Sequence, residues 1–177
     1  IINNQLTAST WTPLCESLFE SHQYFSGSDV TFGDKDVNRR SYVKNKPPQD
    51  TSIITNSKYI SPFDNCASSI AHVILITDGE PTNDFGANGN IESLSVMVPK
   101  VDADGFPIFD ANGDLVYVAK GFDGTKYTDD NSNSYLPALA GWMSTYDINP
   151  DIEGTQTIST HTIGFSSGAD GAAGLLR

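Results

Sequence analysis

An apolar run at residues 69–77 limits the possible folds of this 177-residue chain more than any other feature. The run reads Ser-Ile-Ala-His-Val-Ile-Leu-Ile-Thr, is rich in β-branched residues and ends abruptly at Asp78-Gly79. This pattern is typical of a strand that is buried on both faces of a parallel sheet. A Thr- and Ile-rich segment at 155–165 predicts a second core strand. The length suits one domain and is too short for two.

Two segments with helical periodicity accompany these strands. In residues 12–26, Thr12 is a suitable N-cap, Pro13 suits the first helical position and Gly27 ends the helix. The apolar residues on or near one face of this helix are Leu14, Leu18, Phe19 and Phe25. The corresponding residues of a second helix at 135–145 are Leu136, Leu139, Trp142 and Met143. A short helix is expected at 91–98.

Two further stretches interrupt this order of elements. Residues 28–65 are polar and include Pro47-Pro48, which predicts a long excursion with little regular structure. Residues 100–128 predict a β-hairpin insertion, with strand-like segments at 106–109 and 115–118 around an Asn-Gly turn. Strands alternating with helices indicate an α/β protein with an open sheet flanked by helices.

The charge balance narrows the classes of partner. The formal net charge is −12, from 10 Lys and Arg against 22 Asp and Glu. Nucleic acid is therefore an unsuitable partner, because binding phosphates requires clusters of Lys and Arg. The acidity either simply favours solubility or supplies oxygen ligands to a divalent cation. No stretch approaches the roughly 20 apolar residues of a membrane helix, so we expect no transmembrane segment.

One motif favours an enzyme and is outweighed. Residues 164–168 match Gly-x-Ser-x-Gly, which in α/β-hydrolases places the nucleophile, here Ser166, on a sharp turn. The catalytic residues of α/β-hydrolases follow in the order Ser, acid, His, so the His must come after the Ser. In this chain His22, His72 and His161 all precede Ser166. A plain Gly/Ser loop after a strand is the simpler interpretation, and we expect no enzymatic activity.

Other candidate ligand groups have simple structural interpretations. The segments 102–105 and 110–114 resemble parts of calcium loops, but they lack the complete EF-hand pattern, and turn formation explains both. His72 and His161 fall within the two predicted strands and are expected to be core or edge residues, because no clustered His or Cys offers zinc-ligand spacing.

Asp78 is the strongest candidate site residue. It follows the most hydrophobic strand, and ligands of open α/β sheets bind outside the carboxyl ends of the strands. A carboxylate buried there needs a cation or several hydrogen-bond donors. The alternative is a turn Asp that caps the following loop.

The motifs around Asp78 and Thr12 resemble those of von Willebrand factor A-type (vWA) domains. Ile-Thr-Asp-Gly-Glu-Pro-Thr at 76–82 is similar to the third metal-site motif of that family, and Thr-Pro-Leu-Cys-Glu-Ser-Leu at 12–18 is similar to the second. The resemblance implies a Rossmann-type open sheet. It also implies a metal ion-dependent adhesion site in which Thr12 and Asp78 join the shell of Mg²⁺, Mn²⁺ or Ca²⁺.

Three stretches narrow the resemblance to the vWA region of type IV pilus tip adhesins of the PilC/PilY type. They are residues 12–27, residues 59–82, and residues 136–165 with Leu-Pro-Ala-Leu-Ala-Gly-Trp-Met-Ser and His-Thr-Ile-Gly-Phe. The resemblance implies an adhesin at a bacterial pilus tip or outer cell surface, exported through the periplasm. Its partners would be a host or abiotic surface and, through other parts of the full-length protein, minor pilins. The alternative is a vWA-type scaffold in another secreted or envelope assembly.

The chain departs from the family at one motif. Asp-x-Ser-x-Ser occurs nowhere in residues 1–177, so the expected domain is partial, lacks N-terminal strands and has an incomplete metal site. An absent central strand would leave one side of the 69–77 strand unpaired, and we expect more chain or a neighbouring molecule to cover it.

The two cysteines, Cys15 and Cys66, would pair in an oxidising compartment if their Cα atoms lie within about 7 Å. The family carries cysteines in these segments, which implies a disulfide.

Overall fold

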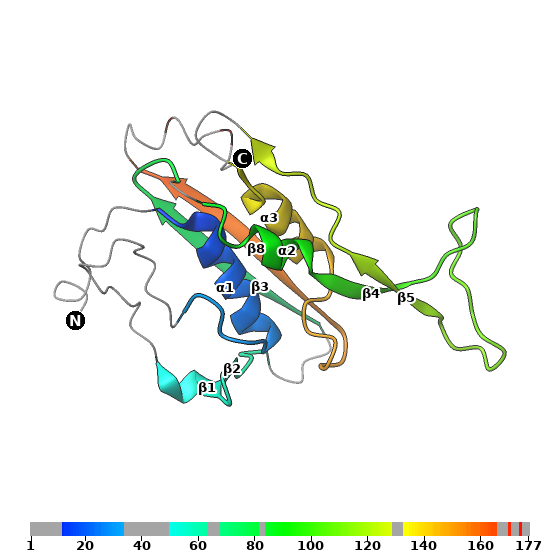
Figure 1. Cartoon of the computed structure of the whole chain (residues 1–177). Helices are drawn as coiled ribbons and strands as arrows, with labels where there is room; N and C mark the ends of the chain where they lie inside the picture. The colour runs from blue at the N-terminus through cyan, green and yellow to red at the C-terminus, as the bar shows by residue number, and fades with distance from the viewer. Residues whose placement is uncertain are drawn as a thin grey trace.

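A parallel pair of strands forms the centre of the chain (Figure 1). The computed structural model describes residues 12–33, 50–63, 68–81, 84–128 and 133–165, together with 170 and 174. Strands β3 (Ser68–Thr77) and β8 (Thr155–Gly164) pair in register from Ser68↔Thr155 to Thr77↔Gly164. The α/β prediction is thereby confirmed at the level of a mixed α/β arrangement with parallel strands and helices.

Helices α1 (Leu14–Ser26) and α3 (Leu136–Thr145) cover one face of this pair (Figure 1). Both helices bury apolar residues at helical spacing, as predicted, and α1 also buries Glu16, His22 and Gln23. The core between helices and strands is made of Leu14, Leu18, Phe19, Leu75, Leu136, Leu139, Met143 and Ile158. Trp142 is also buried, as predicted. Removing this apolar area from water provides the main stabilisation of the arrangement.

The other face of β3 and β8 is exposed, so the prediction of a strand buried on both faces is wrong for this structure. Ile70, Ile74 and Ile76 of β3 are 67%, 58% and 62% exposed. Ile163 of β8 and Phe165 beyond it are 48% and 65% exposed. Side chains alternate between the two faces of a strand, and helices pack on only one of them. We call this outer face, with His72 and His161, the open sheet face.

The beginning of α1 differs from the predicted one. The helix starts at Leu14, and Pro13 occupies the N-cap position with a non-helical ψ of 71°. Thr12 therefore lies before the cap, and the expected Thr12 cap with Pro13 in the first turn is wrong. The C-terminal prediction is confirmed, because Gly27 adopts the left-handed conformation with φ of 70°.

The segment expected as a helix at 91–98 divides into two elements. Helix α2 is Asn88–Glu92, and strand β4 (Ser95–Pro99) follows it. Residues 95–98 form a strand because they pair with β5 (Tyr117–Gly121). The pairing runs from Ser95↔Gly121 to Pro99↔Tyr117. Tertiary pairing outweighs the weak local helix preference here.

The predicted hairpin insertion is a long arm that projects from the body (Figure 1). Beyond β4 and β5, the isolated bridges Val101↔Pro107 and Phe109↔Leu115 continue it toward its tip. The turn at 110–114 is present as predicted, with Gly113 at φ of 89°. Of the flanking segments, 106–109 forms only isolated bridges, whereas residues 117 and 118 of the segment 115–118 belong to β5 and pair with β4.

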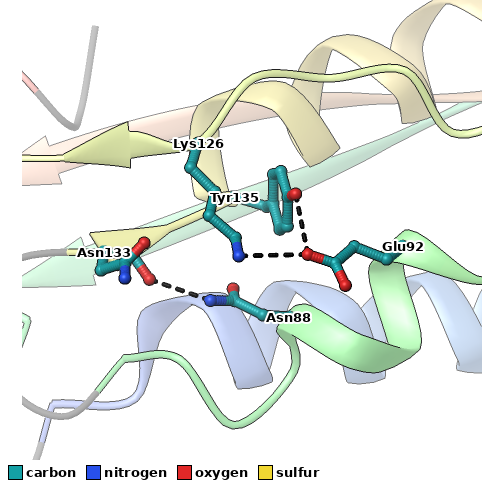
Figure 2. Close-up of polar contacts among 5 residues, drawn as sticks. All are labelled: Asn88, Glu92, Lys126, Asn133 and Tyr135. Carbon is teal, nitrogen blue, oxygen red and sulfur yellow. Dashed lines mark hydrogen bonds and ion pairs between the residues drawn. The ribbon is translucent and has the colours of Figure 1, made fainter.

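Polar contacts hold α2 against the segment that returns from the arm (Figure 2). Glu92 accepts hydrogen bonds from the Tyr135 hydroxyl at 2.9 Å and pairs with Lys126 Nζ at 3.1 Å. The amide nitrogen of Asn88 donates to the carbonyl of Asn133 at 3.0 Å. Lys126 and Asn133 belong to or adjoin the small antiparallel pair β6 (Tyr127–Thr128) and β7 (Asn133–Ser134).

The described parts of the 28–65 excursion hold little regular structure, as expected. They contain a 3₁₀ turn, η2 (Thr51–Ile53), and the two-residue strands β1 (Ile54–Thr55) and β2 (Lys58–Tyr59). Asn56 and Ser57 between them both have positive φ, as a tight hairpin turn requires. In the described part of the chain, no helix has the length and apolar character needed to cross a membrane.

Candidate functional site

The carboxyl ends of β3 and β8 and the N-terminus of α1 lie at the same end of the molecule (Figure 1). The amide of Phe165 donates to the carbonyl of Thr77 at 3.2 Å and holds the two strand ends together. Asp78 follows β3 directly and is exposed, while Thr12 directly precedes the cap of α1. The two predicted metal ligands therefore lie at one edge, the position that open α/β sheets use for ligands.

The loop after β3 is attached to the first turn of α1 by two short hydrogen bonds. The amide of Cys15 donates to Asp84 Oδ1 at 2.6 Å, and the amide of Gly86 donates to Glu16 Oε1 at 2.6 Å. The first amides of a helix have no partner within the helix, so Asp84 caps α1 from 69 residues away in the sequence. This distant cap takes the role that was predicted for Thr12.

Asp84 also connects this loop to α3. Its second oxygen, Oδ2, accepts from the Ser134 hydroxyl at 2.9 Å. The amide of Leu136, at the start of α3, donates to the same Ser134 oxygen at 3.2 Å. One buried carboxyl group thus joins the beginnings of two helices, and we call Cys15, Glu16, Asp84, Ser134 and Gly86 the Asp84 cluster.

The interior of the Asp84 cluster favours uncharged groups. Burial, together with the adjacent Glu16 carboxyl, raises the pKa of Asp84 to about 7, although hydrogen bonds from Cys15 and Ser134 oppose this. Burial, with the charges of Asp84 and Glu16, raises the pKa of the Cys15 thiol to about 12 against the lowering effect of Ser134. Cys15 is consequently a protonated, unreactive thiol at neutral pH.

The disulfide prediction is not settled by these contacts. Cys15 is a free, fully buried thiol in this structure. Its predicted partner, Cys66, lies outside the described residues. The pairing therefore stays a prediction.

The metal prediction also stays a prediction. Among the described residues, no group of three or more His, Cys, Asp or Glu side chains is placed to share a metal ion. Thr12 and Asp78 supply one hydroxyl and one carboxylate, whereas Ca²⁺ takes six to eight oxygen ligands and Mg²⁺ six.

His72 and His161 are exposed and do not lie in the core. Of the two expected places, core or edge, the edge position holds, because each strand of the described two-stranded sheet is an edge strand. They occupy the open sheet face, with Nδ1 of His72 at 3.0 Å from Nε2 of His161 and the two rings stacked. The buried histidine is His22 of α1, beside Gln23, and burial lowers its pKa.

The turn interpretation of the two calcium-like segments is confirmed. Asp102 Oδ1 accepts from the amides of Asp104 and Phe106, both at 2.9 Å. Asp110 Oδ1 accepts in the same way from Asn112 at 2.8 Å and Asp114 at 3.0 Å. Ser166 of the Gly-x-Ser-x-Gly motif lies outside the described residues.

The sequence reading missed Glu16, Asp84 and Ser134 as interacting residues. Asp84 stands in an Asn- and Gly-rich loop and resembles an ordinary turn residue. Glu16 fits the acidic first turn of any helix, where it is usually solvated. No periodicity connects residues 16, 84 and 134, so only the tertiary structure identifies the cluster.

Comparisons of the chain with known protein families, with characterised proteins and with solved structures yield no match.

Proposed function

We propose that this chain is a binding module of the vWA type that acts at the tip of a bacterial type IV pilus, and that it is not an enzyme. The observation that supports this most is the position of Asp78. It is exposed directly after β3, at the edge where the strand ends and the beginning of α1 lie together. The assignment to the vWA type is based on the resemblance of residues 12–18 and 76–82 to the metal-site motifs of that family.

The proposed chemistry is cation-mediated adhesion. Thr12 and Asp78 would hold Mg²⁺, Mn²⁺ or Ca²⁺ through oxygen atoms, and the cation would bridge to a carboxylate on the surface that is bound. Two side chains supply too few oxygens for a tight site. We therefore propose that water, the ligand or further protein groups complete the shell, and that the affinity is modest.

The arm is a second contact surface in this proposal. Phe106 is 67% exposed and Phe109 57% exposed, and both lie on the projecting part of the arm. Exposed aromatic side chains are enriched among residues that dominate protein interfaces. A vWA-type scaffold in another secreted or envelope assembly is the alternative. Co-purification of the full-length protein with minor pilins would favour the pilus-tip adhesin. Purification without minor pilins would favour the scaffold in another assembly.

Isothermal titration calorimetry with Mg²⁺, Mn²⁺ and Ca²⁺ tests the cation site. The wild-type chain is expected to bind at least one of the three, and Asp78→Ala is expected to lower the affinity at least tenfold. Asp114→Ala removes the same charge at an exposed position on the arm and is expected to leave the affinity unchanged. If no cation binds, or if Asp78→Ala binds as tightly as the wild type, the proposed site is wrong.

A further inference from the structure

Two carboxyl groups of the Asp84 cluster are buried in contact with each other. Asp84 is 3% exposed and Glu16 is 7% exposed, and their side chains lie within hydrogen-bonding contact. Glu16 Oε1 accepts from Gly86, while Asp84 accepts from Cys15 and Ser134. Among the described residues, the buried Oε2 of Glu16 has no hydrogen-bond partner. An oxygen of this kind in a buried carboxyl group requires an explanation.

Two negative charges cannot remain together in such a place without compensation, because removing each charge from water is costly. The groups that act on Asp84 are the Glu16 carboxyl and the amide of Cys15 from α1, and the Ser134 hydroxyl from β7. Among the described residues, none of them is a cation. A proton or a bound metal ion would supply the compensating charge.

The hydrogen-bond donors around the pair favour the proton. Three donors point at the two carboxyl groups, from Cys15, Gly86 and Ser134, and they occupy oxygens that a metal ion would need. A proton carried by Asp84 needs a single acceptor, and Glu16 Oε2 is available for it. Each Asp84 oxygen can still accept one bond through its remaining lone pair.

We propose that Glu16 and Asp84 share one proton, and that this proton latches the loop after β3 onto the first turn of α1. The latch closes when the pair holds its proton and weakens when the proton leaves, because two buried carboxylates then repel each other. Its strength controls how firmly Asp84 and Gly86 are held against the first turn of α1, whether or not Asp78 binds a cation.

The pH range follows from the raised pKa of Asp84. Burial and the Glu16 carboxyl raise it from 3.8 to about 7, so the closed loop binds the proton more tightly than the open loop. A group of this kind stabilises the closed loop fully below the ordinary pKa and loses its contribution as the pH rises to the raised one. The latch is therefore strongest in acid and weakest above about pH 7.

Hydrogen exchange of the 177-residue chain, detected by mass spectrometry at pH 5, 6, 7 and 8, tests the latch. After correction for intrinsic exchange, protection of peptides covering 84–88 is expected to fall by up to about tenfold per pH unit between pH 5 and 7, and then to level off. In Asp84→Asn the amide nitrogen donates permanently to Glu16, so protection is expected to be independent of pH. In Glu16→Gln the amide nitrogen of residue 16 donates to Asp84 instead. Protection of peptides 84–88 is expected to be independent of pH in this variant as well.

Glu20→Gln is the matched control. Glu20 lies one turn further along α1 and accepts hydrogen bonds from Thr31, Phe32 and Tyr59, away from the loop after β3. This variant is expected to keep the pH dependence of peptides 84–88. Protection that does not vary with pH in the wild type, or that varies equally in Asp84→Asn, would overturn the proposal.

A second measurement uses only the wild-type chain, so it does not require a variant to fold. Carbon-13 NMR of the carboxyl groups in the wild-type chain follows each titration directly. One Asp carboxyl is expected to titrate near pH 7, far above the ordinary value of 3.8. If every carboxyl group titrates below pH 5, the pair does not share a proton and the proposal fails.

Discussion

At the scale of residues, Gly86 allows the loop after β3 to approach α1. A Cβ at this position would lie 2.6 Å from Glu16 Oε1, closer than real Cβ atoms approach an oxygen. The amide of the same residue donates to that oxygen, so the contact is made by the backbone itself. The three nearest atoms all belong to the Glu16 side chain, so a Cβ at residue 86 would displace that buried carboxyl group.

Gly86→Ala is therefore expected to destabilise the chain by roughly 1–3 kcal/mol, as overpacking in a filled site does. Gly89→Ala is its matched control, because Gly89 lies within α2 with nothing within 4 Å of the added Cβ. Alanine favours a helix interior over glycine by up to about 1 kcal/mol, so this control is expected to be neutral or stabilising. Urea denaturation measures both. Equal midpoints for the two variants would contradict the role given to Gly86.

At the scale of elements, the arm and the body differ in how they are held. The backbone hydrogen bonds of the arm beyond β4 and β5 run within it, such as Lys100 to Val116 and Val116 to Ile108. At its base, Phe122 packs against the core and contacts Trp142 at 5.4 Å between ring centroids. The contacts of Glu92 with Tyr135 and Lys126, shown in Figure 2, also lie at the base of the arm. The distal part therefore adds surface and little stability to the body.

Replacing residues 101–115 by Asn-Gly tests this division. The new turn joins Lys100 and Val116, which are already hydrogen-bonded, and Asn-Gly is a favoured two-residue hairpin turn. The free energy of unfolding is expected to change by less than about 1 kcal/mol, because loop length contributes only slowly to stability. Circular dichroism during thermal unfolding measures this. A loss of the cooperative transition would show that the distal arm supports the body.

At the scale of the whole molecule, the parallel pair has two unequal faces. Helices α1 and α3 cover one, and the open sheet face carries large apolar side chains. Apolar patches of several hundred Å² on one face of a protein mark contact surfaces or aggregation-prone regions. In the described part of the chain β3 pairs with β8 alone, so the expectation that more chain or a neighbouring molecule covers its unpaired edge stays a prediction.

Two substitutions in β8 test the difference in burial between the open sheet face and the face that the helices cover. Ile163 is 48% exposed on the open sheet face, whereas Ile158 is fully buried beneath the helices. Thr keeps the β-branched shape that strands favour, so Ile163→Thr is expected to leave stability within about 0.5 kcal/mol and to reduce binding of the dye ANS. Ile158→Thr is expected to cost roughly 2–4 kcal/mol, because it buries a hydroxyl in the core. Similar losses of stability in both would mean that the two faces are equally buried.

The elements that sequence patterns predicted well are those with strong local signals. Both core strands and both long helices occur within two residues of their expected bounds, and Gly27 ends α1 as its conformational freedom predicts. Asp78 lies at the predicted edge because the end of the apolar run at 69–77 is visible in the sequence. The vWA family, the cation and the disulfide stay predictions.

The sequence by itself determined the alternation of strands and helices, the turn of the arm and the position of Asp78 after β3, since each depends on neighbouring residues. Only the tertiary structure decided that Asp84 caps α1, that Glu16 lies buried beside it, and that 95–98 forms a strand. It also decided which face of β3 stays open. These features depend on pairs of residues far apart in the chain, and local propensity does not contain the energy of such contacts.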